Sequence, residues 1–238
     1  MRHRTTMLAL LAIGTAVAPM PCGLRAQPPI TFATRDDGVV AADEYGAGRD
    51  AVLLVPGGRY ERRSWERQAR LLADSGLRVL ALDLRGRGDS RAGRAGTDSI
   101  QLDVLAAIAY LRATGAQRLT VVGASLGGWA AAEAAIAASP PIDGLVLLAH
   151  APIVRPERLR VRTLFLVSRD DVRGGGIRRL PELREQYRRT RARKTFVVLD
   201  GAAHAQALFA TDQGPTVMAE ILRFARAHGD GGRASPRR

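Results

Sequence analysis

Cysteine is almost absent from the 238-residue sequence, since Cys22 is the only one. A single cysteine cannot form an intrachain disulfide or supply the several thiolates of a zinc or iron–sulfur site. Cys22 also lies in an N-terminal segment that we expect to be removed, which leaves a mature chain without cysteine. That chain has no thiolate nucleophile, and its sequence implies no metal and no organic cofactor.

Apolar runs long enough to cross a membrane are also lacking at the N-terminus. The run Met7–Val17 is too short to span a bilayer comfortably. It follows Arg2 and Arg4 and precedes Leu24-Arg25-Ala26, which is the order of charged start, apolar core and cleavage site in a secretory signal. We therefore predict a signal peptide over residues 1–26, a secreted or periplasmic protein, and no stable membrane insertion after signal removal.

Lysine is nearly missing although the chain is strongly basic, with a net charge of +13. Lys194 is the only lysine among 36 basic residues, and this excess of arginine together with alanine is typical of a GC-rich genome. The arginines are spread along the chain rather than interleaved with aromatic residues, so we expect no nucleic-acid partner. Residues 229–238 are rich in glycine, arginine, proline and serine and are predicted to be a disordered tail.

Residues 27–228 alternate short apolar runs with amphipathic segments, which is the pattern of an α/β domain. Two runs around the turn Asp36-Asp37-Gly38 predict an antiparallel hairpin at one edge of the sheet. The later runs predict a doubly wound, mostly parallel sheet with no large cap domain. The expected strands are 30–34, 39–45, 51–55, 77–82, 119–122, 145–149, 163–168 and 195–199, and the expected helices are 64–75, 100–114, 129–138, 177–189 and 215–227.

The segment Gly123-Ala124-Ser125-Leu126-Gly127 joins a valine-rich strand to an alanine-rich helix. A serine in a sharp strand-to-helix turn needs neighbours without side chains, because a Cβ would clash with the adjoining backbone. Such a turn exposes the Ser125 hydroxyl and directs the N–H of Leu126 toward the same point. The pattern therefore favours Ser125 as a nucleophile over a glycine-rich turn with an incidental serine.

Two further loops follow predicted parallel strands and should reach the same edge of the sheet. Pro56-Gly57-Gly58-Arg59 could supply a second oxyanion donor, from the N–H of either Gly58 or Arg59. Asp170 and Asp171 follow the strand at 163–168, and either carboxylate could orient an imidazole. Asp171 has the preferred spacing, three residues beyond the strand.

Histidine is scarce, with four residues in the chain. His204 lies in a small-residue loop after the last predicted strand and is the natural general base for Ser125. His150 ends a predicted strand, where we expect a structural or site-lining role. The other two, His3 and His228, lie in the signal and at the end of the last helix.

Taken together, these motifs resemble the α/β-hydrolase superfamily over residues 30–228. The motifs are Pro56-Gly57-Gly58, Asp83–Ser90, Gly123–Gly128, Ser168–Asp171 and Gly201–His204.

The resemblance implies a small, lidless, serine esterase-like member with Ser125 as nucleophile, Asp171 as acid, His204 as base, and an oxyanion hole made by Gly58 and Leu126. It also implies that Asp83–Ser90 is a structural turn without catalytic residues. One departure is Pro56, which stands where the family often has a histidine that steadies the oxyanion loop.

The predicted function is that of a carboxylesterase-like serine hydrolase that cleaves ester-type bonds of small acyl substrates through an acyl-enzyme intermediate. A peptidase, thioesterase or acyltransferase would fit the same triad. A non-catalytic member that binds an envelope component through its arginine-rich surface is a different class, and it would not react with a fluorophosphonate probe. A dinucleotide-binding domain is disfavoured, because no G-x-G-x-x-G follows the first parallel strand.

Three arginines follow the predicted oxyanion loop, namely Arg59, Arg62 and Arg63. Near the mouth of a site they would attract an anionic substrate, which is our expectation for the charge of the ligand. The sequence specifies neither the acyl half nor the alcohol half of the substrate, and it specifies no oligomeric state.

Overall fold

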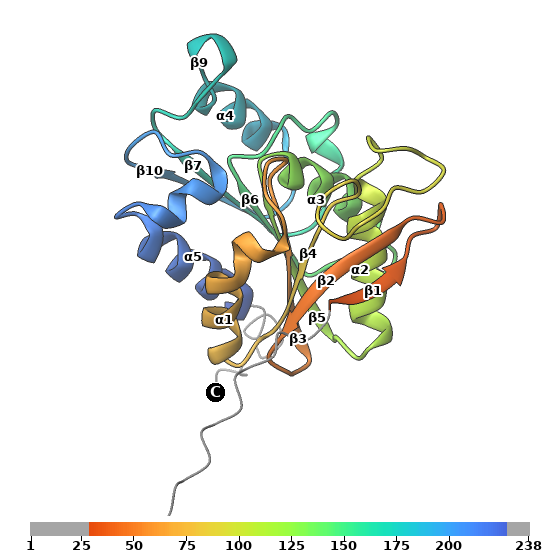
Figure 1. Ribbon diagram of the computed structural model, residues 1–238. Coiled ribbons are helices and arrows are strands. Elements are labelled where there is room, and N and C mark those ends of the chain that lie inside the picture. The colour runs from red at the N-terminus through yellow and green to blue at the C-terminus, as the bar shows by residue number, and fades with distance from the viewer. Residues whose placement is uncertain (1–28, 228–238) are drawn as a thin grey trace, which may run out of the picture.

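A computed structural model describes residues 29–227 of the chain (Figure 1). Cys22, the predicted signal over residues 1–26 and the predicted tail over residues 229–238 lie outside the described residues. The strands are β1 Ile30–Ala33, β2 Val39–Tyr45, β3 Asp50–Val55, β4 Arg78–Leu82, β5 Arg118–Ala124, β6 Gly144–Leu148, β7 Thr163–Ser168, β8 Val172–Arg173, β9 Ile177–Arg178 and β10 Lys194–Leu199. The α-helices are α1 Glu66–Asp74, α2 Gln101–Ala113, α3 Leu126–Ala137, α4 Leu180–Arg189 and α5 Gly214–Arg226. Short 3₁₀ helices are η1 Arg62–Trp65, η2 Pro156–Arg158, η3 Gly174–Gly176 and η4 Ala205–Ala210.

One eight-stranded sheet carries the fold, in the order β1-β2-β4-β3-β5-β6-β7-β10. The strands from β4 to β10 in this order run parallel to one another, whereas β2 is antiparallel to both β1 and β4. The β1–β2 pair is therefore an antiparallel hairpin at the edge. This arrangement confirms the predicted mostly parallel α/β sheet, and no large cap domain is inserted within the described residues.

Helices cover both faces of the sheet, which explains why its central strands are continuous apolar runs (Figure 1). In β3, Leu53 faces the layer beneath α2 and α3, and Leu54 faces the layer beneath α1 and α5. α5 presents Val217, Ile221 and Phe224 to its layer, at the spacing of one helical face. No helix in residues 29–227 is long and apolar enough to cross a membrane.

The direction in which the chain adds strands reverses beside β3. From β3 the chain first adds β4 on one side and then β5 on the other. β3 and β5 are therefore the two strands at the topological switch point, which is where open α/β sheets form a crevice for ligands. The loop after β3 contains Pro56-Gly57-Gly58, and β5 leads directly into Ser125.

Two helices of the structure begin at residues other than those predicted. The predicted helix 177–189 is wrong at its start, because Ile177 and Arg178 form β9, which pairs with β8 as a small hairpin, and α4 begins at Leu180. Three consecutive glycines, Gly174–Gly176, allow this reversal. The predicted helix 129–138 begins earlier, at Leu126, because glycines at positions 127 and 128 let the helix start against neighbouring backbone.

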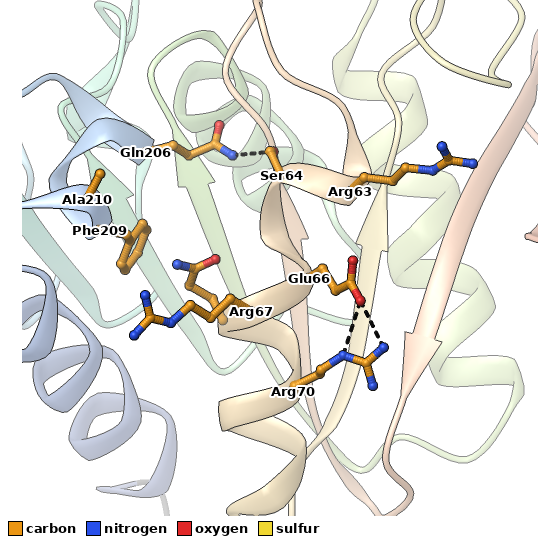
Figure 2. A pocket seen from close by; sticks show the side chains of 9 residues that line it. Arg63, Ser64, Glu66, Arg67, Arg70, Gln206, Phe209 and Ala210 are labelled. Carbon is orange, nitrogen blue, oxygen red and sulfur yellow. Dashed lines mark hydrogen bonds and ion pairs between the residues drawn. The ribbon is translucent and has the colours of Figure 1, made fainter. Parts of the chain in front are cut away.

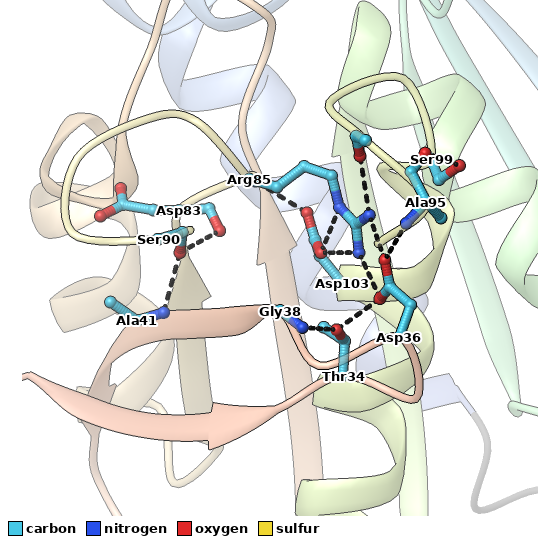
Figure 3. A network of polar contacts seen from close by, with 11 residues as sticks. Thr34, Asp36, Gly38, Ala41, Asp83, Arg85, Ser90, Ala95, Ser99 and Asp103 are labelled. Atoms are coloured by element: carbon cyan, nitrogen blue, oxygen red, sulfur yellow. Dashed lines mark hydrogen bonds and ion pairs between the residues drawn. The ribbon is translucent and has the colours of Figure 1, made fainter. Parts of the chain in front are cut away.

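A buried ion-pair network anchors the turn of the edge hairpin to α2 (Figure 3). The side chain of Arg85 is fully buried between Asp103 in α2 and Asp36 in the turn. Its Nε donates to Asp103 Oδ1 at 2.9 Å, and its backbone N–H donates to Asp103 Oδ2 at 2.7 Å. Thr34 Oγ1 donates to Asp36 Oδ1 at 2.6 Å, so both carboxylates have several partners. The Arg85 bonds hold the pKa of Asp36 well below its usual range.

Asp103→Ala should therefore lower the free energy of unfolding by about 3 kcal/mol, because it leaves a buried guanidinium with one partner fewer. Urea denaturation monitored by circular dichroism measures this change. The matched control is Glu66→Ala, which breaks the exposed Glu66–Arg70 pair and should leave stability nearly unchanged. Equal midpoints for the two variants would contradict the assigned importance of the network.

Candidate active site

Ser125 lies in a strained turn between β5 and α3. Its backbone φ is 50° and its ψ is −117°, a conformation that residues with a side chain rarely adopt. Flanking glycines make this turn sterically feasible. A Cβ on Gly123 would lie 2.6 Å from the carbonyl oxygen of Gly127, so only glycine fits there. The turn places the Ser125 hydroxyl at the N-terminus of α3, as the sequence motif predicts.

Gly127 lets the elbow meet the loop that follows β3. A Cβ at this position would clash with the carbonyl oxygen of Pro56 and would lie 2.8 Å from that of Val55. The absence of a side chain therefore permits direct backbone contact between the two loops. On the other side of this contact, a Cβ on Gly57 would lie 3.5 Å from the Cβ of Ser125. The serine and the glycine loop are thus immediate neighbours.

Three residues far apart in sequence meet at this point. His204 Nε2 lies 2.8 Å from Ser125 Oγ, and His204 Nδ1 lies 2.7 Å from Asp171 Oδ2. Asp171 is 1% exposed, whereas about a third of the His204 side chain is open to solvent. A hydroxyl, an imidazole and a buried carboxylate thus form a continuous hydrogen-bonded row, which is the geometry of a nucleophile, a base and its orienting acid.

The two candidate acids point in different directions. Asp170 Oδ1 accepts a hydrogen bond of 2.6 Å from Arg178 in the β8–β9 hairpin, and its side chain is exposed. Asp171 instead points inward to His204, and its other oxygen lies 3.5 Å from Nε of Arg179. Of the two aspartates, only Asp171 is in contact with the imidazole.

Backbone donors at the site come from two loops. Gly57 donates its N–H to Gln206 Oε1 at 2.7 Å, and Pro56 has no N–H. Within residues 29–227, the N–H groups of Gly58 and Leu126 donate no hydrogen bond. A Cβ on Gly58 would lie 3.0 Å from Leu126 Cδ2, so these two candidate oxyanion residues are adjacent. The N–H of Arg59 is also without an acceptor within the same residues.

Ser125 and His204 line an open cavity of about 500 Å³. One wall comes from the loop after β3, and the facing wall comes from the β8–β9 hairpin. The lining residues include three arginines and no acidic residue; the arginines are Arg59, Arg173 and Arg179. Leu126 is 41% exposed and separates this cavity from an apolar recess of about 370 Å³ beside Trp129.

The prediction that three arginines lie at the mouth of the site is correct for only one of them. Arg59 lines the cavity, whereas Arg63 lines a different depression. The prediction is wrong for Arg62, which is 3% exposed and pairs with Asp43, Asp83 and Asp89. Arg62 is the first residue of η1, and its guanidinium is buried against the turn that contains Asp83 and Asp89.

His150 is packed beneath the elbow and does not line the cavity. His150 is 1% exposed, and a Cβ added to Gly128 would lie only 2.7 Å from the Cβ of His150. The His150 ring packs edge-on against Phe165, with the ring centroids 5.5 Å apart. Burial lowers the pKa of His150 to about 4, and the positive charge of Arg179 acts in the same direction. The imidazole is therefore a neutral packing group under α3.

Sequence reasoning missed three residues at the site. Arg179 belongs to the predicted helix 177–189 and Arg173 to the loop before it, so the sequence pattern placed neither beside the serine. Gln206 lies two residues after His204, and its hydrogen bond to Gly57 spans 149 positions in sequence. No cluster of three or more histidine, cysteine, aspartate or glutamate side chains able to hold a metal occurs in the described part of the chain.

Residues 50–226 match the model of a family described as the alpha/beta hydrolase fold, and the chain belongs to this family. No curated protein sequence matches the chain. An esterase of Pyrococcus furiosus has a similar structure, with a TM-score of 0.71 at 16% identity, covering 84% of this chain and 89% of that one. A thermophilic esterase of Thermogutta terrifontis gives 0.66 at 20% identity, with coverages of 84% and 98%. A dienelactone hydrolase of Anabaena variabilis gives 0.65 at 18% identity, with coverages of 83% and 97%.

The lowered pKa of His150 predicts an acid-sensitive fold. Between about pH 6.5 and 4 the unfolded chain binds a proton at this residue and the folded chain does not, so stability should fall as the pH falls through this window. The full effect corresponds to about 3 kcal/mol. In His150→Leu, the free energy of unfolding should depend less steeply on pH between 4 and 6.5, measured by urea denaturation at each pH. Parallel pH profiles for the two proteins would contradict burial of a neutral imidazole.

Proposed function

We propose that this protein is a serine hydrolase that cleaves ester bonds of small acyl substrates, with Ser125 as nucleophile, His204 as general base and Asp171 as the orienting acid. The observation that carries the proposal is the hydrogen-bonded row from Ser125 Oγ through both nitrogens of His204 to Asp171. Membership in the α/β-hydrolase fold family and the esterases among similar structures support the class of reaction.

The chemistry follows from the positions of these groups. His204 Nε2 removes the proton of Ser125 as its oxygen attacks the substrate carbonyl, and the ester carbonyl becomes a tetrahedral oxyanion. The N–H groups of the adjacent residues Gly58 and Leu126, which have no acceptor within residues 29–227, are the proposed donors that stabilise that charge. Asp171 keeps the Nδ1 proton of His204 directed away from the serine. The imidazolium then gives its proton to the leaving alcohol, and the neutral imidazole that results removes a proton from the water that hydrolyses the acyl-enzyme.

A small ester with a short acyl group fits the surroundings of Ser125. The cavity is bounded by two short loops, and no cap domain folds over it within residues 29–227. The apolar recess beyond Leu126, lined by Ile100, Trp129 and Pro152, offers room for a short hydrocarbon group. Esters also need no strong activation of the leaving group, which suits an exposed imidazole.

Ser125→Ala should lower kcat on an aryl ester by about a thousandfold or more, because the nucleophile is lost while the binding surface stays intact. A fluorophosphonate probe should label the parent protein at Ser125 and should not label the variant. Ser99→Ala, which changes a half-buried serine before α2, is the control and should keep both activity and labelling. Unchanged hydrolysis by Ser125→Ala would refute the assignment, and an unlabelled parent protein would favour a non-catalytic member.

We further propose that the favoured ester carries a negative charge on its acyl part. Arg59 has no ion-pair partner within the described residues, and Arg173 has only a distant one, Glu182 at 4.0 Å. Together with Arg179 they give the cavity a positive wall without an acidic lining residue. A carboxylate at the far end of a short acyl chain would be attracted to this wall.

The para-nitrophenyl monoester of adipic acid should therefore react with a higher kcat/KM than para-nitrophenyl hexanoate, which has the same chain length without the charge. Arg59→Gln and Arg173→Gln should each reduce this preference by about two- to fivefold, since each removes one partly screened charge. Arg118→Gln changes an arginine at the far end of β5 and should not alter it. Equal kcat/KM values for the two esters in the parent protein would remove the charge proposal and leave the hydrolase proposal intact.

A further inference from the structure

We infer that Gln206 is a positioning residue that holds the oxyanion loop in register with the nucleophile. This inference rests on the proposed hydrolase function and goes beyond it by assigning a role to a residue outside the triad. Gln206 is 7% exposed and belongs to η4, which begins immediately after His204. Its amide joins two elements from the other half of the chain, the loop after β3 and η1.

Both ends of the Gln206 amide are bonded. Oε1 accepts the N–H of Gly57 at 2.7 Å, and Nε2 donates to Ser64 Oγ at 2.6 Å (Figure 2). Ser64 Oγ in turn donates its only hydrogen to the carbonyl oxygen of Glu61 at 2.5 Å. The serine oxygen can therefore only accept from Gln206, which fixes the amide with its oxygen toward Gly57. The network specifies one orientation of the side chain.

The oxyanion loop has one internal hydrogen bond, from the N–H of Tyr60 to the carbonyl oxygen of Gly57 at 2.9 Å, and Gln206 adds a support from outside the loop. Gly57 and Gly58 have no side chains that pack, and Pro56 offers neither an N–H nor a polar side chain to anchor them. The hydrogen bond from the N–H of Gly57 fixes the peptide plane between Pro56 and Gly57, where the Gly57–Gly58 plane begins. The next N–H along, that of Gly58, is the proposed oxyanion donor. Gln206 thus limits the movement of that donor relative to Leu126 without contacting the substrate.

The same short segment also positions the base. Ala205, between His204 and Gln206, has a backbone φ of 50°, and this turn sends the two neighbouring side chains to different partners. Before it, Ser168 Oγ donates to the carbonyl oxygen of Ala203 at 2.6 Å and ties the segment to β7. After it, Phe209 packs edge-on against Trp65 of η1 at 5.5 Å. The imidazole and the oxyanion loop therefore share one rigid support.

Neighbouring charges do not compete for this amide. Gln206 borders a depression of about 590 Å³ that also contains Arg63, Arg67 and Arg70. Arg70 is engaged with Glu66, and the guanidinium groups of Arg63 and Arg67 extend in different directions, away from Gln206 (Figure 2). The depression offers no convergent group of arginines for a ligand, and the polar contacts of Gln206 are directed to the loops.

Gln206→Met keeps the length of the side chain and removes both hydrogen bonds. It should lower kcat on para-nitrophenyl butyrate by about tenfold to a hundredfold and change KM by less than about twofold, because a loosened donor weakens the transition state and not the bound ester. Affinity for a trifluoromethyl ketone, which forms an oxyanion on Ser125, should fall by the same factor. Gln206→Glu keeps an acceptor for Gly57 and should retain more activity than Gln206→Met.

Gln186→Met is the matched control, since Gln186 is also buried and its Oε1 accepts a backbone N–H, that of Ile153, at 2.9 Å. It should cost similar thermal stability with kcat within about twofold of the parent. If Gln206→Met does not fold, Ser64→Ala removes one anchor of the same amide and should lower kcat and ketone affinity in the same proportion, by a smaller factor.

Two results would overturn the inference. The first is that Gln206→Met has the same kcat and the same ketone affinity as Gln186→Met. Where Ser64→Ala is used in place of Gln206→Met, the same comparison applies to it. The second is a rise in KM with unchanged kcat, which would place Gln206 in substrate binding. A parent protein that neither hydrolyses the ester nor reacts with fluorophosphonate would instead overturn the hydrolase proposal itself, and the inference with it.

Discussion

The close backbone contact between the turn that contains Ser125 and the loop after β3 is the constraint on which the rest of the site depends. Gly127 has no Cβ, so α3 can begin against the carbonyl oxygens of Val55 and Pro56. Because β3 and β5 are adjacent parallel strands, both loops leave the sheet at the same edge. Their contact brings Gly58 beside Leu126. Asp171 and His204 reach Ser125 from the loops after β7 and β10, both farther along the same sheet edge.

The sheet was predictable because its strands are short apolar runs separated by helical periodicity, and the parallel order follows from that alternation. The proposed triad could be read from sequence for a related reason. Ser125, Asp171 and His204 each follow a predicted strand, and all of these strands end at the same edge. Sequence spacing within each loop was then enough to propose the three residues, whereas the choice between Asp170 and Asp171 depended on side-chain direction.

What escaped prediction depends on long-range contacts. Arg62 looks exposed in sequence, yet three aspartates from two other segments surround it and bury its charge. Gln206 carries no local signal, because its partners lie some 140 positions or more away. The β8–β9 hairpin was missed for a different reason. Ile177 and Arg178 fit the pattern of the helix that follows them, and the strands of the hairpin are only two residues long, too short for an alternating apolar pattern.

The β8–β9 hairpin pairs only with itself, as a separate two-stranded sheet. It contributes Val172 and Arg173 to the cavity wall, yet it supplies no strand to the central sheet and little to either core layer. Changes in its length or side chains would therefore alter what faces the serine at little expense to folding. The hairpin is therefore a segment in which substitutions would change the lining of the cavity beside Ser125 without removing a strand from the central sheet.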